Sequence, residues 1–216
     1  CSTTAINTAE YCGVFSELRK ECGALIHFTI GSGLSSCYQN AVLAANEVPG
    51  VTVVDSMNLT TGIGYLAVAA AKMAAAGMEL EEITAKLEEL KAHMDVSFVI
   101  DKLDYLKKGG RCSAVTAFGA NLLNIKPSIC MKNGTLAVEK KYRGAFRQCV
   151  RRDIEERLYA GEDRWGPGII FFTPRGRSGT GVGETAELIK KPGHLSEILV
   201  TEGRCTRVRQ CGSTYP

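Results

Sequence analysis

Residues 24–36 read ALIHFTIGSGLSS, an apolar run followed directly by a loop of glycine and serine. The run 24–30 is short and rich in residues that favour strands, which predicts a buried strand. Two glycines then interrupt the pattern, and Ser35 precedes a stretch of helical character over residues 36–47. This order predicts a strand, a loop and a helix, with the loop at the carboxyl end of the strand.

The serine loop has two interpretations. Backbone N–H groups at a helix start, with the hydroxyls of Ser32 and Ser35 nearby, form a site suited to an anion. In the other interpretation, Ser35 only caps the helix by accepting one of those N–H groups. The two roles are compatible, so these residues alone leave both open.

Strand and helix signals alternate on both sides of this loop. Residues 51–54 (VTVV) predict a second buried strand, and helical spacing marks three further segments, residues 11–22, 62–76 and 79–94. This alternation is typical of a parallel sheet with crossover helices. Asp55 stands at the end of the second strand, where it either caps the next turn or binds a metal or a hydroxyl group.

The pattern changes near residue 95. Asn133-Gly134 between two apolar segments predicts a tight hairpin turn. Other strands are predicted at residues 96–100, 169–173 and 198–201, and other helices at 113–124, 143–158 and 184–191. We therefore predict an α/β protein of two lobes, an N-terminal parallel-sheet lobe over residues 1–95 and a C-terminal mixed α/β lobe over residues 96–216.

Composition excludes several classes of protein. Lys and Arg outnumber Asp and Glu by only three, 26 against 23, which gives no support to a nucleic acid-binding surface. No apolar run reaches the roughly 18–20 residues that span a bilayer, and no signal peptide pattern is present. The nine cysteines are irregularly spaced without a CxxC, which favours reduced thiols and a cytoplasmic location. The chain starts at Cys1 rather than Met, so we expect a fragment or a trimmed product.

Catalytic groupings have little support in the sequence. His27 lies within an apolar strand and His93 ends a helix, and neither the HExxH nor the GxSxG motif occurs. Cys37 and Cys130 are candidate nucleophiles, although free cysteine behaves mostly as a small buried hydrophobe. A basic loop, KKGGR, ends at Arg111, whose guanidinium suits a carboxylate or phosphate, but a solvated turn explains the loop equally well.

Five segments, in this order, resemble the DegV family, whose members include bacterial fatty acid-binding proteins. They are Thr3-Thr4, residues 30–41 (IGSGLSSCYQNA), Asp55-Ser56 with Gly62-Ile63-Gly64, residues 103–111 (LDYLKKGGR) and residues 122–134 (LLNIKPSICMKNG). The match runs from about Thr3 to Leu158 and continues more weakly to Thr206. The loop KKGGR and the segment with Ile125-Lys126-Pro127 are quite specific when they occur together.

The resemblance implies that the chain is no enzyme and that it needs no metal or cofactor. A long-chain fatty acid such as palmitate, stearate or oleate would lie in an apolar tunnel between two lobes. Its carboxylate would be held at the tunnel mouth and presented to a separate ATP-dependent fatty acid kinase. The residues at which the resemblance implies ligand contacts are Thr3, Thr4, Ser32, Ser35 and Arg111.

This sequence departs from the family pattern at three places. An upstream strand is absent, Gly31 replaces the first serine of the serine motif, and a C-terminal histidine motif has no counterpart near Gln210-Cys211-Gly212. The main alternative is an enzyme that acts on a small carboxylate or phosphorylated substrate in the same cleft, because a fold alone does not fix function. A third possibility is a regulatory interaction protein whose bound lipid is structural.

Overall fold

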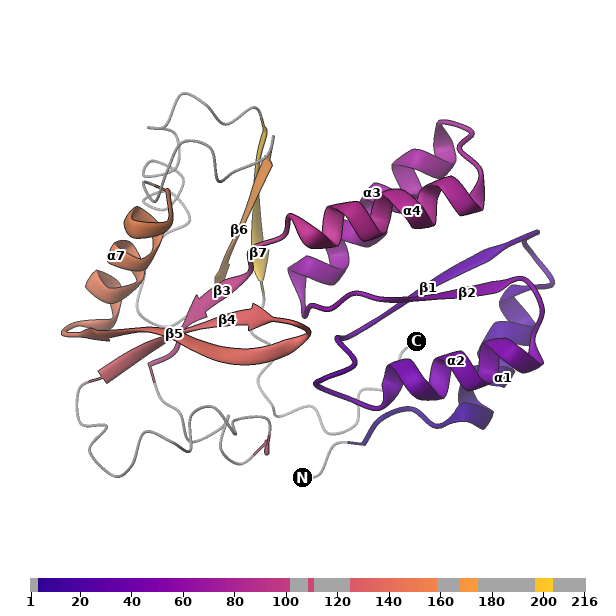
Figure 1. Ribbon diagram of the computed structural model, residues 1–216, viewed down its shortest axis with the longest axis horizontal. Helices are drawn as coiled ribbons and strands as arrows, with labels where there is room; N and C mark the ends of the chain where they lie inside the picture. The colour runs from indigo at the N-terminus through magenta and orange to yellow at the C-terminus, as the bar shows by residue number, and fades with distance from the viewer. Residues whose placement is uncertain (1–3, 102–108, 111–124, 159–167, 175–196, 204–216) are drawn as a thin grey trace.

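The computed structural model describes residues 4–101, 109–110, 125–158, 168–174 and 197–203 (Figure 1). The N-terminal elements are α1 (Thr8–Leu18), β1 (Leu25–Thr29), α2 (Cys37–Glu47), β2 (Val51–Asp55), α3 (Thr61–Ala75) and α4 (Leu80–Ala92). The C-terminal elements are β3 (Ser97–Val99), β4 (Ile125–Lys132), β5 (Thr135–Arg143), α7 (Phe146–Leu158), β6 (Gly168–Pro174) and β7 (Glu197–Gly203). The predicted α/β class is confirmed, whereas the helices predicted at 113–124 and 184–191 lie outside the described residues. The division at residue 95 stays a prediction.

A parallel pair of strands forms the centre of the N-terminal part. β1 and β2 run side by side from Leu25 opposite Val51 to Thr29 opposite Asp55. Side chains alternate between the two faces of a strand, so each face packs against its own pair of helices. Val54 contributes to a core with α3 and α4, whereas Val53 packs on the opposite face against α1 and α2. Because helices cover both faces, the strand ends and their loops are where a ligand has access.

Helix α1 begins at Thr8, earlier than the predicted residue 11, and ends at Leu18 rather than residue 22. A capping box explains the early start, since the Asn7 side chain accepts the Glu10 N–H and the Glu10 carboxylate accepts the Asn7 N–H. The helix then packs Tyr11 and Phe15 edge-on against His27, with ring centroids 5.2 and 5.1 Å away. Burial lowers the pKa of His27, which confirms its interpretation as a core residue.

The C-terminal part contains an antiparallel sheet of order β3-β4-β5 and a parallel pair, β6 with β7. The predicted hairpin is confirmed, because Asn133 and Gly134 connect β4 to β5 with φ angles of 51° and 72°, as in a type I′ turn. β5 extends to Arg143, which pairs with Ile125. The helix predicted from residue 143 therefore begins only at Phe146.

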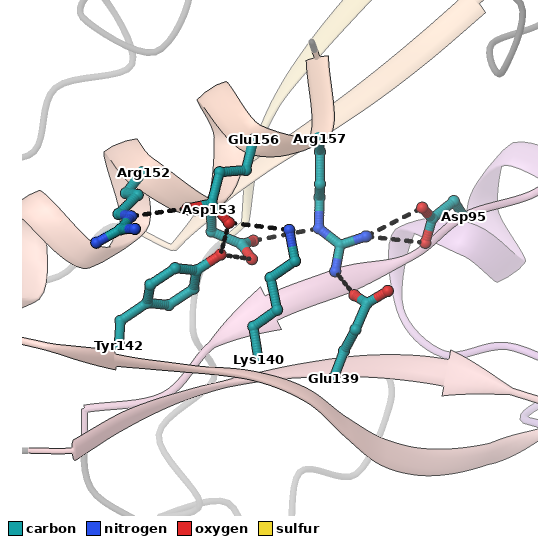
Figure 2. A network of polar contacts seen from close by, with 8 residues as sticks. All are labelled: Asp95, Glu139, Lys140, Tyr142, Arg152, Asp153, Glu156 and Arg157. Atoms are coloured by element: carbon teal, nitrogen blue, oxygen red, sulfur yellow. Dashed lines mark hydrogen bonds and ion pairs between the residues drawn. The ribbon is translucent and has the colours of Figure 1, made fainter. Parts of the chain in front are cut away.

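A network of charged side chains joins α7 to the antiparallel sheet (Figure 2). Arg157 pairs with Asp95 at 3.0 Å, with Asp153 at 3.3 Å and with Glu139. Asp153 is buried, and its carboxylate also accepts the hydroxyl of Tyr142 at 3.1 Å. Burial, followed by the charge of Asp153, raises the pKa of Tyr142 well above its ordinary value. Glu156 completes the network by accepting hydrogen bonds from Tyr142, Lys140 and Arg152.

Candidate functional site

Three segments of the chain meet at the carboxyl ends of β1 and β2. The serine loop (residues 31–36) follows β1, and the β2–α3 loop (residues 56–60) follows β2. The hairpin tip (residues 132–135) reaches them from the antiparallel sheet, as Figure 1 shows. Ligands of α/β proteins bind preferentially at the carboxyl ends of parallel strands. We call this meeting point the loop junction.

Asp55 connects the first two segments of the loop junction. Its Oδ1 accepts the N–H of Ser32 at 3.1 Å and the N–H of Met57 at 2.9 Å, and its backbone carbonyl accepts the Lys91 ammonium at 2.9 Å. Of the roles left open by the sequence, the structure therefore supports the cap of a turn. Within the described part of the chain, no group of three His, Cys, Asp or Glu is placed to hold a metal ion.

Ser56 and Asn58 support the loop junction from below, and sequence reasoning did not identify Asn58. The Ser56 hydroxyl donates to the carbonyl of Asn58 and accepts its N–H, both at 3.1 Å, with both residues buried. The same Asn58 carbonyl accepts the N–H of Gly31 at 2.8 Å, which ties the β2–α3 loop to the serine loop. The signal for this brace was the run Asp55 to Asn58 directly after a strand, because short polar side chains there bond to nearby backbone.

The two candidate serines differ in what their hydroxyls do. Ser35 Oγ donates to Cys37 Sγ at 3.1 Å and accepts the Cys37 N–H at 3.3 Å. Helix α2 begins at Cys37, one residue later than predicted, and its N-cap residue Ser36 makes no side-chain cap. Ser32 is exposed, and within the described residues its hydroxyl has no hydrogen-bond partner. Capping therefore engages Ser35, while Ser32 retains a free donor and acceptor.

Cys37 occupies the first turn of α2, directly behind Ser35. Burial raises the pKa of its thiol, but hydrogen bonds from Ser35, the Ile6 N–H, Tyr11 and its own N–H outweigh burial and lower the pKa below its usual value. Burial together with the neighbouring Cys37 raises the pKa of Tyr11 to about 12. Cys130, the other candidate nucleophile, is buried in β4, where burial raises the pKa of its thiol, as expected for a small core residue.

The remaining sequence-predicted residues lie on two other segments. Thr4 is exposed, in the segment before α1. Ile6 fixes this segment to the start of α2, because its carbonyl accepts the Asn40 amide at 2.7 Å and its N–H bonds to Cys37. Thr3 and Arg111 lie outside the described residues. Gly110, which precedes Arg111, has a φ of 69°, a backbone conformation that glycine adopts without strain.

A family model for an uncharacterised protein of the DegV family matches residues 1–202. The chain belongs to the DegV family. A DegV domain-containing protein of Caldanaerobacter subterraneus subsp. tengcongensis is 36% identical over 145 residues, covering 66% of this chain and 52% of that protein. The chain thus spans about half the length of the curated DegV relatives it matches.

Solved structures of DegV relatives share this fold. A fatty acid-binding DegV family protein from Thermus thermophilus has a TM-score of 0.79 and 29% identity, covering 93% of this chain and 71% of that one. A Thermotoga maritima protein described as having a fatty acid-binding function has a TM-score of 0.75 and 25% identity, over 93% and 70% of the two chains. A stearic acid-binding protein from Eubacterium ventriosum has a TM-score of 0.69 and 25% identity, over 90% and 68%. These DegV relatives bind fatty acids, as the resemblance implied.

The helices of the described segments include none that is long and apolar enough to cross a membrane.

Proposed function

We propose that this DegV protein binds a long-chain fatty acid with the carboxylate at the loop junction and the acyl chain in an apolar tunnel between the two lobes. The observation that carries the proposal is the exposed, unpartnered hydroxyl of Ser32 beside the start of α2. A helix N-terminus favours negative charge, and a hydroxyl donor adds a directed hydrogen bond to a carboxylate. Each methylene buried in the tunnel contributes about 0.8 kcal/mol, so the chain supplies most of the affinity.

The other ligand contacts follow the family resemblance. Thr3 and Thr4 approach the carboxylate from the segment that Ile6 fixes beside α2. Ser35 serves the site indirectly, because its hydroxyl holds Cys37 and the first turn of α2. Arg111 follows the flexible pair Gly109-Gly110, and its planar guanidinium suits a carboxylate or an acyl phosphate.

We further propose that the bound carboxylate is presented to a separate fatty acid kinase, and that this chain catalyses no step itself. During phosphorylation the head group changes from a carboxylate to an acyl phosphate and gains negative charge. A fixed guanidinium at Arg111 stabilises that added charge more than it stabilises the starting acid, and such differential binding accelerates the step.

Fatty acid binding is tested by extracting the purified chain with solvent and identifying the lipid by mass spectrometry. We expect a C14–C18 fatty acid, and uptake of added palmitate or oleate by protein that has been delipidated. Protein that carries no lipid and takes up neither acid would contradict the proposal. Turnover of a small carboxylate or phosphorylated compound by that empty protein would instead support the enzyme alternative.

A further inference from the structure

The hairpin tip packs closely against the serine loop on both sides of Ser32. A β-carbon placed on Gly33 would lie 2.5 Å from Thr135 Cγ2 and 2.8 Å from the Gly134 carbonyl oxygen. A β-carbon placed on Gly31 would lie 3.0 Å from the same oxygen. Gly31 and Gly33 have no positive φ, so it is the approach of the hairpin, rather than the backbone conformation, that requires glycine at these positions.

The tip is buried where it meets the N-terminal part. Gly134 is the second central residue of a tight turn, yet it is buried rather than exposed. The Met57 side chain lies beneath it, because a β-carbon on Gly134 would lie 3.1 Å from Met57 Sδ. Met57 is a flexible side chain that adapts to a moving surface.

The polar groups at this contact are satisfied within their own segments. The N–H of Gly31 bonds to Asn58, the N–H of Ser32 bonds to Asp55, and Thr135 Oγ1 donates to the Lys132 carbonyl at 2.9 Å. Lifting the tip therefore breaks van der Waals contacts without leaving these groups unpaired, and unpaired buried polar groups are what make most separations costly. A contact of this kind is suited to repeated opening.

We propose that the hairpin tip is a latch on the serine loop, and that it must lift for a fatty acid to enter or leave the loop junction. The proposal rests on the proposed function, because it assumes a carboxylate bound at Ser32. Ser32 stands between Gly31 and Gly33, the two residues against which the tip packs. The tight turn at Asn133-Gly134 keeps the tip stiff, so it moves as one unit with the ends of β4 and β5.

The latch is tested with four proteins derived from the same chain. Gly33→Ala adds the β-carbon that the closed tip excludes. Thr135→Ser removes Cγ2 but keeps the hydroxyl that bonds to Lys132, and the double variant combines the two changes. Gly13→Ala is the matched control, because Gly13 is an exposed residue of α1 and a β-carbon there meets nothing within 4 Å.

Rates of palmitate uptake and release are then measured, using radiolabelled palmitate and an excess of unlabelled palmitate for the release phase. In Gly33→Ala we expect both rates to rise roughly tenfold, since overpacking destabilises only the closed state. The acceleration should shrink in the double variant, and Gly13→Ala should behave as wild type. Faster release with unchanged uptake would overturn the latch, because the tip would then be part of the binding surface rather than a gate. Wild-type rates in Gly33→Ala would overturn it as well.

Thermal unfolding of the same proteins without ligand separates the latch from fatty acid binding. If the tip is docked, Gly33→Ala and Thr135→Ser are energetically coupled, and the double variant is more stable than the two single effects predict. Additive effects would overturn docking of the tip. A wild-type chain that binds no palmitate would instead refute the proposed function, and the gating role with it, while the coupling still reports whether the tip is docked.

Discussion

The loop junction and the network around Arg157 are both polar, but they use their polar groups in opposite ways. In the network, Arg157 faces three carboxylates, and Glu156 accepts hydrogen bonds from Tyr142, Lys140 and Arg152 (Figure 2). At the loop junction, backbone groups are bound to Asp55 and Asn58, while the Ser32 hydroxyl is exposed and unpartnered among the described residues. A network that satisfies its own charges holds the fold together, whereas a braced loop with a free donor is able to bind a ligand.

The comparison matters because overall charge would favour the other place for a carboxylate. An open groove of about 540 Å³ lies at the end of β4 and β5 away from the hairpin tip, and several cations line it. Its lining residues are Ile125, Lys140, Lys141, Tyr142, Arg143, Arg152 and Glu156. Glu156 already pairs with two of these cations, Lys140 at 2.9 Å and Arg152 at 2.7 Å. We therefore assign the groove to the folded framework and the loop junction to the ligand.

The largest expected effect is on stability, and it comes from the network. Arg157→Met should destabilise the protein by about 3 kcal/mol, because it leaves the buried Asp153 without its cationic partner. Arg151→Met is the matched control on the same helix, since the Arg151 side chain is 64% exposed and exposed pairs contribute about 1 kcal/mol or less. Urea unfolding measures both. Equal losses in the two variants would show that the network is not the stabilising element.

A second prediction concerns transfer of the ligand to the kinase. Arg111→Ala should reduce acyl phosphate formation roughly tenfold to a hundredfold, because a donor aimed at developing charge is lost. Fatty acid affinity should fall much less, and Arg111→Lys should restore only part of the activity, since lysine lacks the planar fork. The assay pairs palmitate titration with phosphorylation by the kinase and ATP. Equal losses of binding and transfer would make Arg111 a ligand anchor instead.

The Ser32 hydroxyl should matter for the carboxylate and not for the fold. Ser32→Ala should weaken palmitate binding by roughly 0.5–3 kcal/mol, the range for a hydrogen bond to a neutral or charged group. Binding of the matching fatty alcohol should change less, and the unfolding temperature should hardly move. Ser16→Ala, at an exposed serine of α1, is the control. If acid and alcohol lose affinity equally, Ser32 does not recognise the carboxylate.

The smallest effect expected is a pH dependence of stability. Hydrogen bonds from Lys140 and then Arg152 lower the pKa of Glu156 to about 2, below the 4.5 of a free glutamate. A lowered pKa means that the stabilisation is complete above about pH 5 and is lost as pH falls towards 2. A third of the Glu156 side chain is exposed, so the contribution is about 1 kcal/mol. Unfolding curves from pH 6 to pH 2 should fall less steeply for Glu156→Gln, and parallel curves would contradict the assignment.

Local patterns in the sequence predicted the frame of the loop junction. The apolar run before Gly31, the second strand and the turn at Asn133-Gly134 each have a short-range signature, and each is present in the structure. Boundaries were shifted where a partner decides the end of an element. β5, for example, continues to Arg143 because Ile125 is there to pair with it.

Contacts between distant residues could not be predicted in this way. Arg157 pairs with Asp95, 62 residues earlier, and no periodicity indicates that pairing. The approach of Thr135 to Gly33 is of the same kind, since the glycine itself reads only as a flexible loop residue. The buried role of Asn58 depends on a carbonyl that faces Gly31, which only the folded backbone provides.

A crystal structure of the chain with palmitate tests the central claim most directly, because the two polar regions offer the carboxylate two separate places. We predict carboxylate oxygens within about 2.5–3.2 Å of the Ser32 hydroxyl, at the loop junction beneath the hairpin tip. A carboxylate found instead in the groove between Lys140 and Arg152 would contradict the account.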